Sequence, residues 1–153
     1  MRRYAFWLLA LCICAVPTVA RAITTCDSTY AQDIARQGYH YLDVHNYNDA
    51  RMAAGQLALY AKNCDDPKVG YPSVVYSAYI GSAAFHGLGD DGRAAQALKM
   101  GLMVLDVLKK DGGYAPLYYA MEPKFVDLER EIKPAAAAAA AAPAPPAQAP
   151  VSP

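Results

Sequence analysis

The sequence predicts an all-α fold with two antiparallel helical hairpins, a C-terminal capping helix and an Ala/Pro-rich tail. Between residues 23 and 133, apolar side chains recur at steps of three and four, the period of an α-helix, and strand-like alternation is absent. Polar or glycine-rich breaks divide this stretch into helical segments. Two cysteines, Cys26 and Cys64, are equally distant from the first break. About 110 residues are enough to bury the core of a single domain.

Residues 1–22 have the features of a cleaved secretory signal peptide. Two arginines precede the apolar run Ala5–Val16, and Pro17 and a small-residue stretch that ends at Ala22 follow it. The run would form a helix of about 18 Å, which is shorter than the ~30 Å hydrocarbon core of a bilayer. We therefore expect cleavage after Ala22, or else after Ala20, and no integral membrane segment after cleavage. The expected location is the periplasm or the extracellular space, and a bacterial source is favoured because the sequence has no Asn-x-Ser/Thr acceptor.

The charge of the chain gives no indication of nucleic-acid binding. The full sequence has 14 Lys+Arg and 14 Asp+Glu, and loss of residues 1–22 leaves 11 basic against 14 acidic residues. No local cluster of lysine and arginine supplies a basic surface. We therefore exclude nucleic acid from the expected partners.

The first hairpin is expected between the two cysteines. Asp27 or Ser28 would cap its first helix, and the two helices would meet at the polar sequence HNYND, residues 45–49. An antiparallel turn there brings Cys26 and Cys64 to the same end of the hairpin. Because an exported protein with an even cysteine count is usually disulfide-bonded, we expect a Cys26–Cys64 bond. Closing this loop should stabilise the domain by about 4 kcal/mol in the chain-entropy model.

The second hairpin and the capping helix follow a polar connection. Pro72 is expected in the first turn of the third helix, and the sequence GLGDDG, residues 87–92, is expected to turn the chain into a helix over about residues 93–110. A last helical segment is expected from about residue 124 to residue 132, directly after Pro123. This segment would cap the stack, so that the helical domain spans residues 23–133.

Residues 134–153 form an Ala/Pro-rich tail. This tail and the lysine before it contain six prolines, and the tail itself carries no charged side chain. Because these residues offer almost no side chain that could build a core, we expect the tail to be disordered. We interpret it as a spacer, with a proline-dependent ligand for a partner domain as the alternative.

A weak internal repeat relates the two hairpins. The first copy has Gly38, Tyr41, Tyr47, Ala50, Ala54 and Leu57, and the second has Ser82, Phe85, Asp91, Ala94, Leu98 and Gly101 at the same spacings. This pattern resembles tetratricopeptide repeats, in which a small residue lets paired helices approach and an aromatic residue three positions later fills the interface. The two copies are 44 residues apart rather than the family's ~34, and Asp91 stands where an aromatic residue is expected. Related helical-hairpin repeats, such as Sel1-like ones, and an ordinary α-helical bundle are the alternatives.

The resemblance implies that the first helix of each hairpin lines a concave groove. The residues that would face this groove are Gln32, Tyr39, Asp43, Tyr76, Tyr79 and His86. Tyrosine suits polypeptide binding because its rigid ring gives contact area at a small entropic cost, although helical spacing also allows these rings to be core. The expected function is an adaptor or assembly accessory that binds a protein or peptide in the envelope. An enzyme inhibitor or a small hydrolase on the same scaffold is the alternative.

No residue pattern predicts a cofactor, a metal site or a catalytic centre. His86 could pair with Asp90 or Asp91 and with Ser82, but no nucleophile-elbow glycines surround a serine. The oxygen-rich residues 43–49 lack the central glycine and the final glutamate of a calcium-binding hand, so we interpret them as a turn and a helix N-cap. We therefore expect a protein that is not an enzyme.

Overall fold

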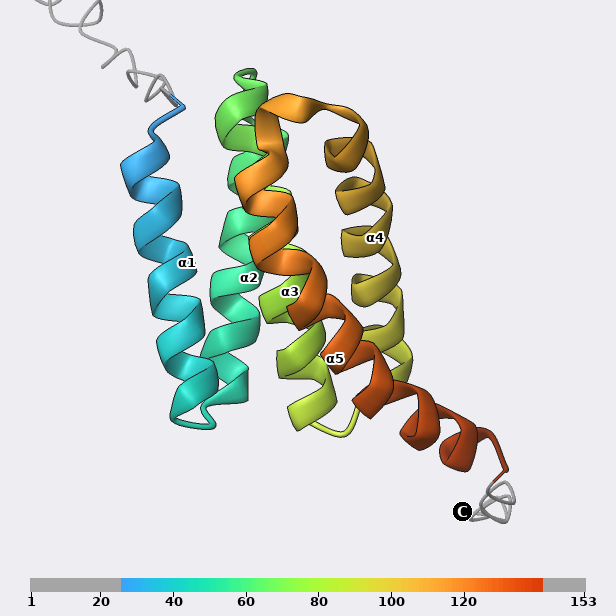
Figure 1. Cartoon of the computed structure of the whole chain (residues 1–153). Coiled ribbons are helices and arrows are strands. Elements are labelled where there is room, and N and C mark those ends of the chain that lie inside the picture. Colours follow the sequence, from blue (N-terminus) through green and yellow to red (C-terminus); the bar gives the residue numbers. More distant parts are fainter. Residues whose placement is uncertain (1–25, 142–153) are drawn as a thin grey trace, which may run out of the picture.

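The computed structural model describes the backbone of residues 26–141 and the side chains of residues 26–133. The elements, in chain order, are α1 (Ser28–Asp43), α2 (Tyr47–Lys62), α3 (Pro67–Gly87), α4 (Asp91–Lys110), a 3₁₀ turn η1 (Gly112–Tyr114) and α5 (Ala115–Ala141) (Figure 1). The predicted all-α class is confirmed for this part of the chain, which contains no strand. None of these helices is both long enough and apolar enough to cross a bilayer. The expected signal peptide, residues 1–22, lies outside the described residues.

Helix α3 is central to the packing. Consecutive helices pack against each other, α1 also packs against α3, and α5 packs against both α4 and α3. In Figure 1, α5 crosses in front of α3, between α1 and α4. Two apolar cores result, one among α1, α2 and α3 and the other among α3, α4 and α5. Helices α2 and α4 flank α3 and do not pack against each other.

Polar N-cap residues fix where four of the helices begin. A side-chain oxygen of the residue before each helix accepts a hydrogen bond from a first-turn N–H, and these residues are Asp27, Asn46, Asp66 and Asp90. Each such cap contributes about 0.5–2 kcal/mol. The cap at Asp66 starts α3 at Pro67, so the expected start near Pro72 is wrong by five residues. Pro67 needs no N–H partner at the first helical position, and Pro72 removes a single hydrogen bond early in the helix.

Helix α5 is longer than predicted at both ends. The sequence indicated a helix over about residues 124–132, whereas α5 begins at Ala115 and runs through Pro123 to Ala141. Its buried side chains are Tyr118, Met121, Phe125, Leu128 and Ile132, at steps of three and four. This continuous apolar stripe packs against α4 and α3 and outweighs the hydrogen bond that Pro123 removes. The backbone of residues 134–141 belongs to α5, and the rest of the expected tail, residues 142–153, lies outside the described residues.

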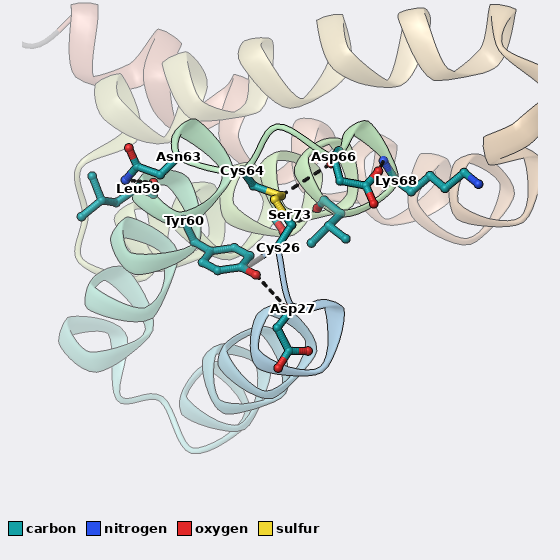
Figure 2. Close-up of a disulfide and its surroundings, with 10 residues drawn as sticks. Cys26, Asp27, Leu59, Tyr60, Asn63, Cys64, Asp66, Lys68 and Ser73 are labelled. Atoms are coloured by element: carbon teal, nitrogen blue, oxygen red, sulfur yellow. Dashed lines mark hydrogen bonds between the residues drawn. A yellow bond between two sulfur atoms is a disulfide. The ribbon is translucent and has the colours of Figure 1, made fainter. Parts of the chain in front are cut away.

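The predicted disulfide joins Cys26 to Cys64. Their Cα atoms are 5.2 Å apart, and the bond ties the segment before α1 to the connection between α2 and α3 (Figure 2). The Tyr60 hydroxyl donates a hydrogen bond of 2.9 Å to the carbonyl oxygen of Asp27, beside the disulfide. The ring of Tyr60 also packs against Tyr30, with 5.4 Å between ring centroids. The start of α1 and the end of α2 are therefore held together by covalent, polar and aromatic contacts.

The α1–α2 turn and the α3–α4 turn share one backbone pattern, offset by 44 residues. His45 and Gly89 are the middle residues, and both have positive φ, 56° and 76°. The following residues, Asn46 and Asp90, each donate their N–H to the carbonyl five residues earlier, at 2.8 and 2.9 Å. Each then caps the next helix. The internal offset found in the sequence is thus present in the backbone of the two turns.

Candidate functional site

Three of the predicted groove residues come together between α1 and α3. Tyr39 of α1 lies 6.3 Å from Tyr76 and 5.7 Å from Tyr79 of α3, measured between ring centroids. All three rings are half-buried. We call these three residues the tyrosine cluster.

Helix α5 lies across the tyrosine cluster. The Tyr39 hydroxyl donates a hydrogen bond of 3.6 Å to the sulfur of Met121. The ammonium of Lys124 lies 4.8 Å from the ring centroid of Tyr39 and 5.8 Å from that of Tyr79. The ring of Phe125 packs against Tyr79 at 5.5 Å. The chain itself therefore fills the space next to these rings in which a bound polypeptide was expected.

Burial of the tyrosine cluster shifts the acidity of two of its hydroxyls. Burial raises the pKa of Tyr39 above its ordinary value, and the neighbouring rings of Tyr79 and Tyr76 raise it further. Burial also raises the pKa of Tyr79, and nearby carboxylates, of which Glu131 has the largest effect, add to the shift. Both hydroxyls therefore stay protonated at neutral pH, and that of Tyr39 serves as the hydrogen-bond donor to Met121.

The other three predicted groove residues lie around the cluster at separate places. Gln32 is exposed on α1 and shares a 240 Å³ hollow with Tyr76, between α1, α3 and the start of α5. Asp43 is the exposed last residue of α1. His86, near the end of α3, pairs with Asp91 at the start of α4, with 2.6 Å between Nδ1 and Oδ1. The six predicted residues therefore do not form one open surface.

Ser82 is not available as a nucleophile for the His86–Asp91 pair. Ser82 is fully buried and donates its hydroxyl to the carbonyl of Ala94 at 2.8 Å. Its oxygen is thus occupied in helix packing and closed to a substrate. Within residues 26–133, no three His, Cys, Asp or Glu side chains gather as a metal site. The pair links α3 to α4 across their turn.

An apolar groove opens on the other side of α3, between α2 and α4. It has a volume of 620 Å³, and we call it the α2–α4 groove. Small residues form much of its lining: Ala54, Gly55, Ala58, Ser77, Ala78 and Gly81. At 100° per residue, the α3 residues of this lining point away from the face of α3 that carries Tyr76 and Tyr79. The groove and the tyrosine cluster therefore occupy opposite faces of α3.

Two methionines form the rim of the α2–α4 groove. Met52 on α2 is 56% exposed and Met100 on α4 is 62% exposed, and both side chains line the groove. The floor is apolar, because the hydroxyl of Ser77 donates to the carbonyl of Ala54 at 2.8 Å and so offers no free donor. A Cβ placed on Gly55 would meet nothing within 4 Å. The groove is therefore an open apolar surface that the described part of the chain does not cover.

The charged side chains that line the α2–α4 groove are Arg51 and Lys62. They lie eleven residues apart on α2, about 16 Å at 1.5 Å per residue and on nearly the same face of the helix. Neither forms an ion pair with an acidic side chain of residues 26–133. Arg93, which stacks on Phe85 at the edge of the groove, is by contrast paired with Asp90 at 2.7 Å. The groove itself is thus apolar along its length and cationic toward both ends.

A second hollow lies between α4 and α5. Its volume is 720 Å³, and Met103 of α4, 62% exposed, is part of its lining. Its charged residues have both signs, and two of them, Glu129 and Lys133, pair with each other at 2.9 Å. This hollow therefore lacks the one-sided charge of the α2–α4 groove, and Met103 provides a matched comparison for Met100.

The α2–α4 groove was not predicted from the sequence. Its lining consists mainly of alanine, glycine and serine, which carry no recognisable chemistry and fit the interior of a helix pair equally well. The signal that could have found it is the pair of methionines on the polar sides of their helices.

The chain matches no protein-family model, and comparisons with curated proteins and with solved structures gave no match.

Proposed function

We propose that the protein is exported and binds another polypeptide, as an adaptor or assembly accessory in the periplasm or envelope of a bacterium. The observation that carries this proposal is the α2–α4 groove, an apolar surface that the described chain leaves uncovered. Concave and mainly apolar surfaces are the usual places where protein domains bind ligands. The Cys26–Cys64 bond suits an oxidising compartment, as does the N-terminal pattern of a signal peptide.

We also propose that the two helical hairpins are repeats of the tetratricopeptide kind. The common turn geometry at His45 and Gly89 and the common N-caps at Asn46 and Asp90 support an internal duplication. Helical-hairpin repeats often serve as scaffolds for polypeptide binding on an extended surface. In this chain, however, α5 lies on the α1–α3 side, and we therefore propose the α2–α4 groove as the binding surface.

The chemistry of the groove favours a polypeptide ligand. Exposed methionines at a rim adapt their shape to a partner, as in other proteins that bind peptide segments. The groove follows α2 from Arg51 to Lys62, about three helical turns, which suits an elongated ligand. We do not extend the proposal to hydrolysis, because the serine closest in sequence to His86 is the buried Ser82.

Site-specific photo-crosslinking in the native compartment tests this function. A photoreactive residue replaces Met100 in one variant and Met103 in a matched control, since both are methionines of α4 with equal exposure of 62%. The variant at Met100 should crosslink to a second polypeptide, identified by mass spectrometry, and Met52→Glu in the same chain should abolish the crosslink. Crosslinks from position 103 alone, or none from position 100, would contradict binding at the groove.

A further inference from the structure

We propose that the occupant of the α2–α4 groove is an amphipathic helix that carries an acidic side chain near each end of its apolar face. This inference rests on the proposed function and specifies the chemistry of the partner. Three properties of the groove support it: a floor whose hydroxyl and backbone groups are already hydrogen-bonded, a lining of small residues, and the position of its two cations.

The hydrogen bonds around the groove favour a helical ligand over an extended one. The walls and floor belong to α2, α3 and α4, whose interior N–H and carbonyl groups are paired within their own helices. The hydroxyl of Ser77 is already bonded to α2. An extended peptide would leave its own backbone groups without partners against this surface, whereas a helix pairs them internally.

The lining also permits a close approach of a helix. Gly55 and Ala58 of α2, Ala78 and Gly81 of α3, and Ala97 of α4 present little side chain to the groove. The side chains of an incoming helix can therefore reach the floor, at positions spaced by three and four residues along one face. Met52 and Met100 would then close over its flanks.

The two cations, which form no ion pair within residues 26–133, set the charge pattern of the ligand. Arg51 and Lys62 are separated by eleven residues of helix, or three turns, so a helix lying along α2 can offer carboxylates at the same separation. Opposite charges at the ends of an apolar contact fix its register and speed association. Within residues 26–133, no acidic side chain lines the groove to compete with the ligand.

Other occupants fit this charge pattern less well. The tail of this chain, residues 134–153, contains no aspartate or glutamate. A second copy bound through the same face would bring its own Arg51 and Lys62 against these cations, because a two-fold interface pairs a surface with itself. A fatty acid has a single carboxylate and can satisfy one end only. A helix with an acidic side chain near each end can pair with both cations and also cover the apolar centre of the groove.

The first experiment selects peptide ligands from a random library, without assuming their sequence. A library of random 16-residue peptides displayed on phage is selected on the purified exported protein, and clones that also bind the Met100→Glu variant are removed. Circular dichroism first establishes that this variant is folded. We expect the surviving peptides to share apolar residues at steps of three and four and a pair of Asp or Glu residues about eleven positions apart. Survivors that are basic, proline-rich or strand-like, or an empty selection, would overturn the inference.

A charge-reversal cycle then tests the two cations directly. The best peptide and its acid-to-Lys version are titrated against the native protein and against Arg51→Glu/Lys62→Glu, by fluorescence anisotropy. The acidic peptide should bind the native protein at least tenfold more tightly than the Lys version, and the order should reverse for the double variant. Equal affinities of the two peptides, both lost in Met100→Glu, would leave polypeptide binding at the groove intact and overturn the acidic-helix assignment.

Two further probes separate the rival occupants. Oleate should not displace the bound peptide, and sedimentation of the exported protein should show no dimer that Met100→Glu dissociates. Displacement by oleate, or a dimer that depends on Met100, would assign the groove to a fatty acid or to a second copy and would overturn the inference. If no crosslink forms at position 100 in the native compartment, the proposed function fails as well.

Discussion

The α-carbon of Gly101 lies directly against the ring of Phe125. A Cβ at position 101 would collide with Cε1 and Cζ of this ring and would lie 3.0 Å from the Cβ of Ala78. Phe125 of α5 is fully buried in the core formed by α3, α4 and α5. Gly101 therefore allows α5 to pack closely on α4, which explains a glycine in the interior of a helix.

Gly101→Ala should lower the free energy of unfolding by about 1–3 kcal/mol, the usual cost of overpacking a core. Alanine favours a helix by about 1 kcal/mol over glycine, so any loss arises from the clash with Phe125. The measurement is urea unfolding followed by circular dichroism. Gly55→Ala is the matched control, since a Cβ there meets nothing within 4 Å, and it should raise stability. A Gly101→Ala protein as stable as the native one would show that the contact is not tight.

Reduction of the Cys26–Cys64 bond should destabilise the domain. The bond closes a separation of 38 residues, and such a crosslink contributes about 2–4 kcal/mol by restricting the unfolded chain. Urea unfolding with and without reductant measures the difference. In the Cys26→Ala/Cys64→Ala variant, reductant should have no effect. Equal stability of the oxidised and reduced native protein would contradict a structural role for the bond.

Truncation of a ring in the tyrosine cluster should lower the free energy of unfolding, as truncation of a buried core side chain does. Tyr79 contacts Phe125 and the ammonium of Lys124, both from α5, so Tyr79→Ala should cost about 1–3 kcal/mol of unfolding free energy. Tyr119→Ala is the control, because this ring is 71% exposed and its loss should change stability by less than about 0.5 kcal/mol. Tm and urea midpoints of both variants test the difference. A Tyr79→Ala protein with native stability but lost partner binding would instead return the binding site to the cluster.

The raised pKa of Tyr39 predicts a loss of stability in alkali. The folded state holds this proton more tightly than the unfolded chain does, because burial raises the pKa of Tyr39. The resulting stability is present below the unfolded pKa of about 10 and falls as the pH rises above it. Tyr39→Phe should therefore flatten the fall in unfolding free energy above about pH 10, measured by urea titration at each pH. An unchanged profile for Tyr39→Phe would contradict the assignment.

Local sequence signals predicted the parts of the fold that short-range chemistry determines. The Cys26–Cys64 pairing and the turns at His45 and Gly89 follow from polar and glycine-rich breaks between apolar periods. The six residue pairs of the internal repeat also share their burial: Gly38 and Ser82, for example, are both buried. These features depend on neighbours within a few residues or on a single equal spacing.

The features that the sequence did not predict depend on packing between distant helices. Pro72 and Pro123 indicated helix boundaries, yet both lie inside helices whose buried stripes compensate for one missing hydrogen bond. The close packing of α5 on α4 involves a contact between Gly101 and Phe125, two residues that lie far apart in the sequence and that no helical periodicity pairs. The α2–α4 groove likewise exists because α2 and α4 do not meet, and this separation is not encoded in either helix alone.

The methionine methyl groups provide the most direct test of where a polypeptide binds. Apart from Met1, the sequence has four methionines: Met52 and Met100 line the α2–α4 groove, Met103 lines the α4–α5 hollow, and Met121 of α5 is buried next to Tyr39. The measurement is a ¹³C-methyl NMR titration of the exported protein with the polypeptide identified by crosslinking. Binding at the groove predicts large shifts for Met52 and Met100 and small ones for Met103 and Met121. Shifts of Met121 or Met103 with Met52 and Met100 unchanged would contradict it and place the partner on the α5 side of the molecule.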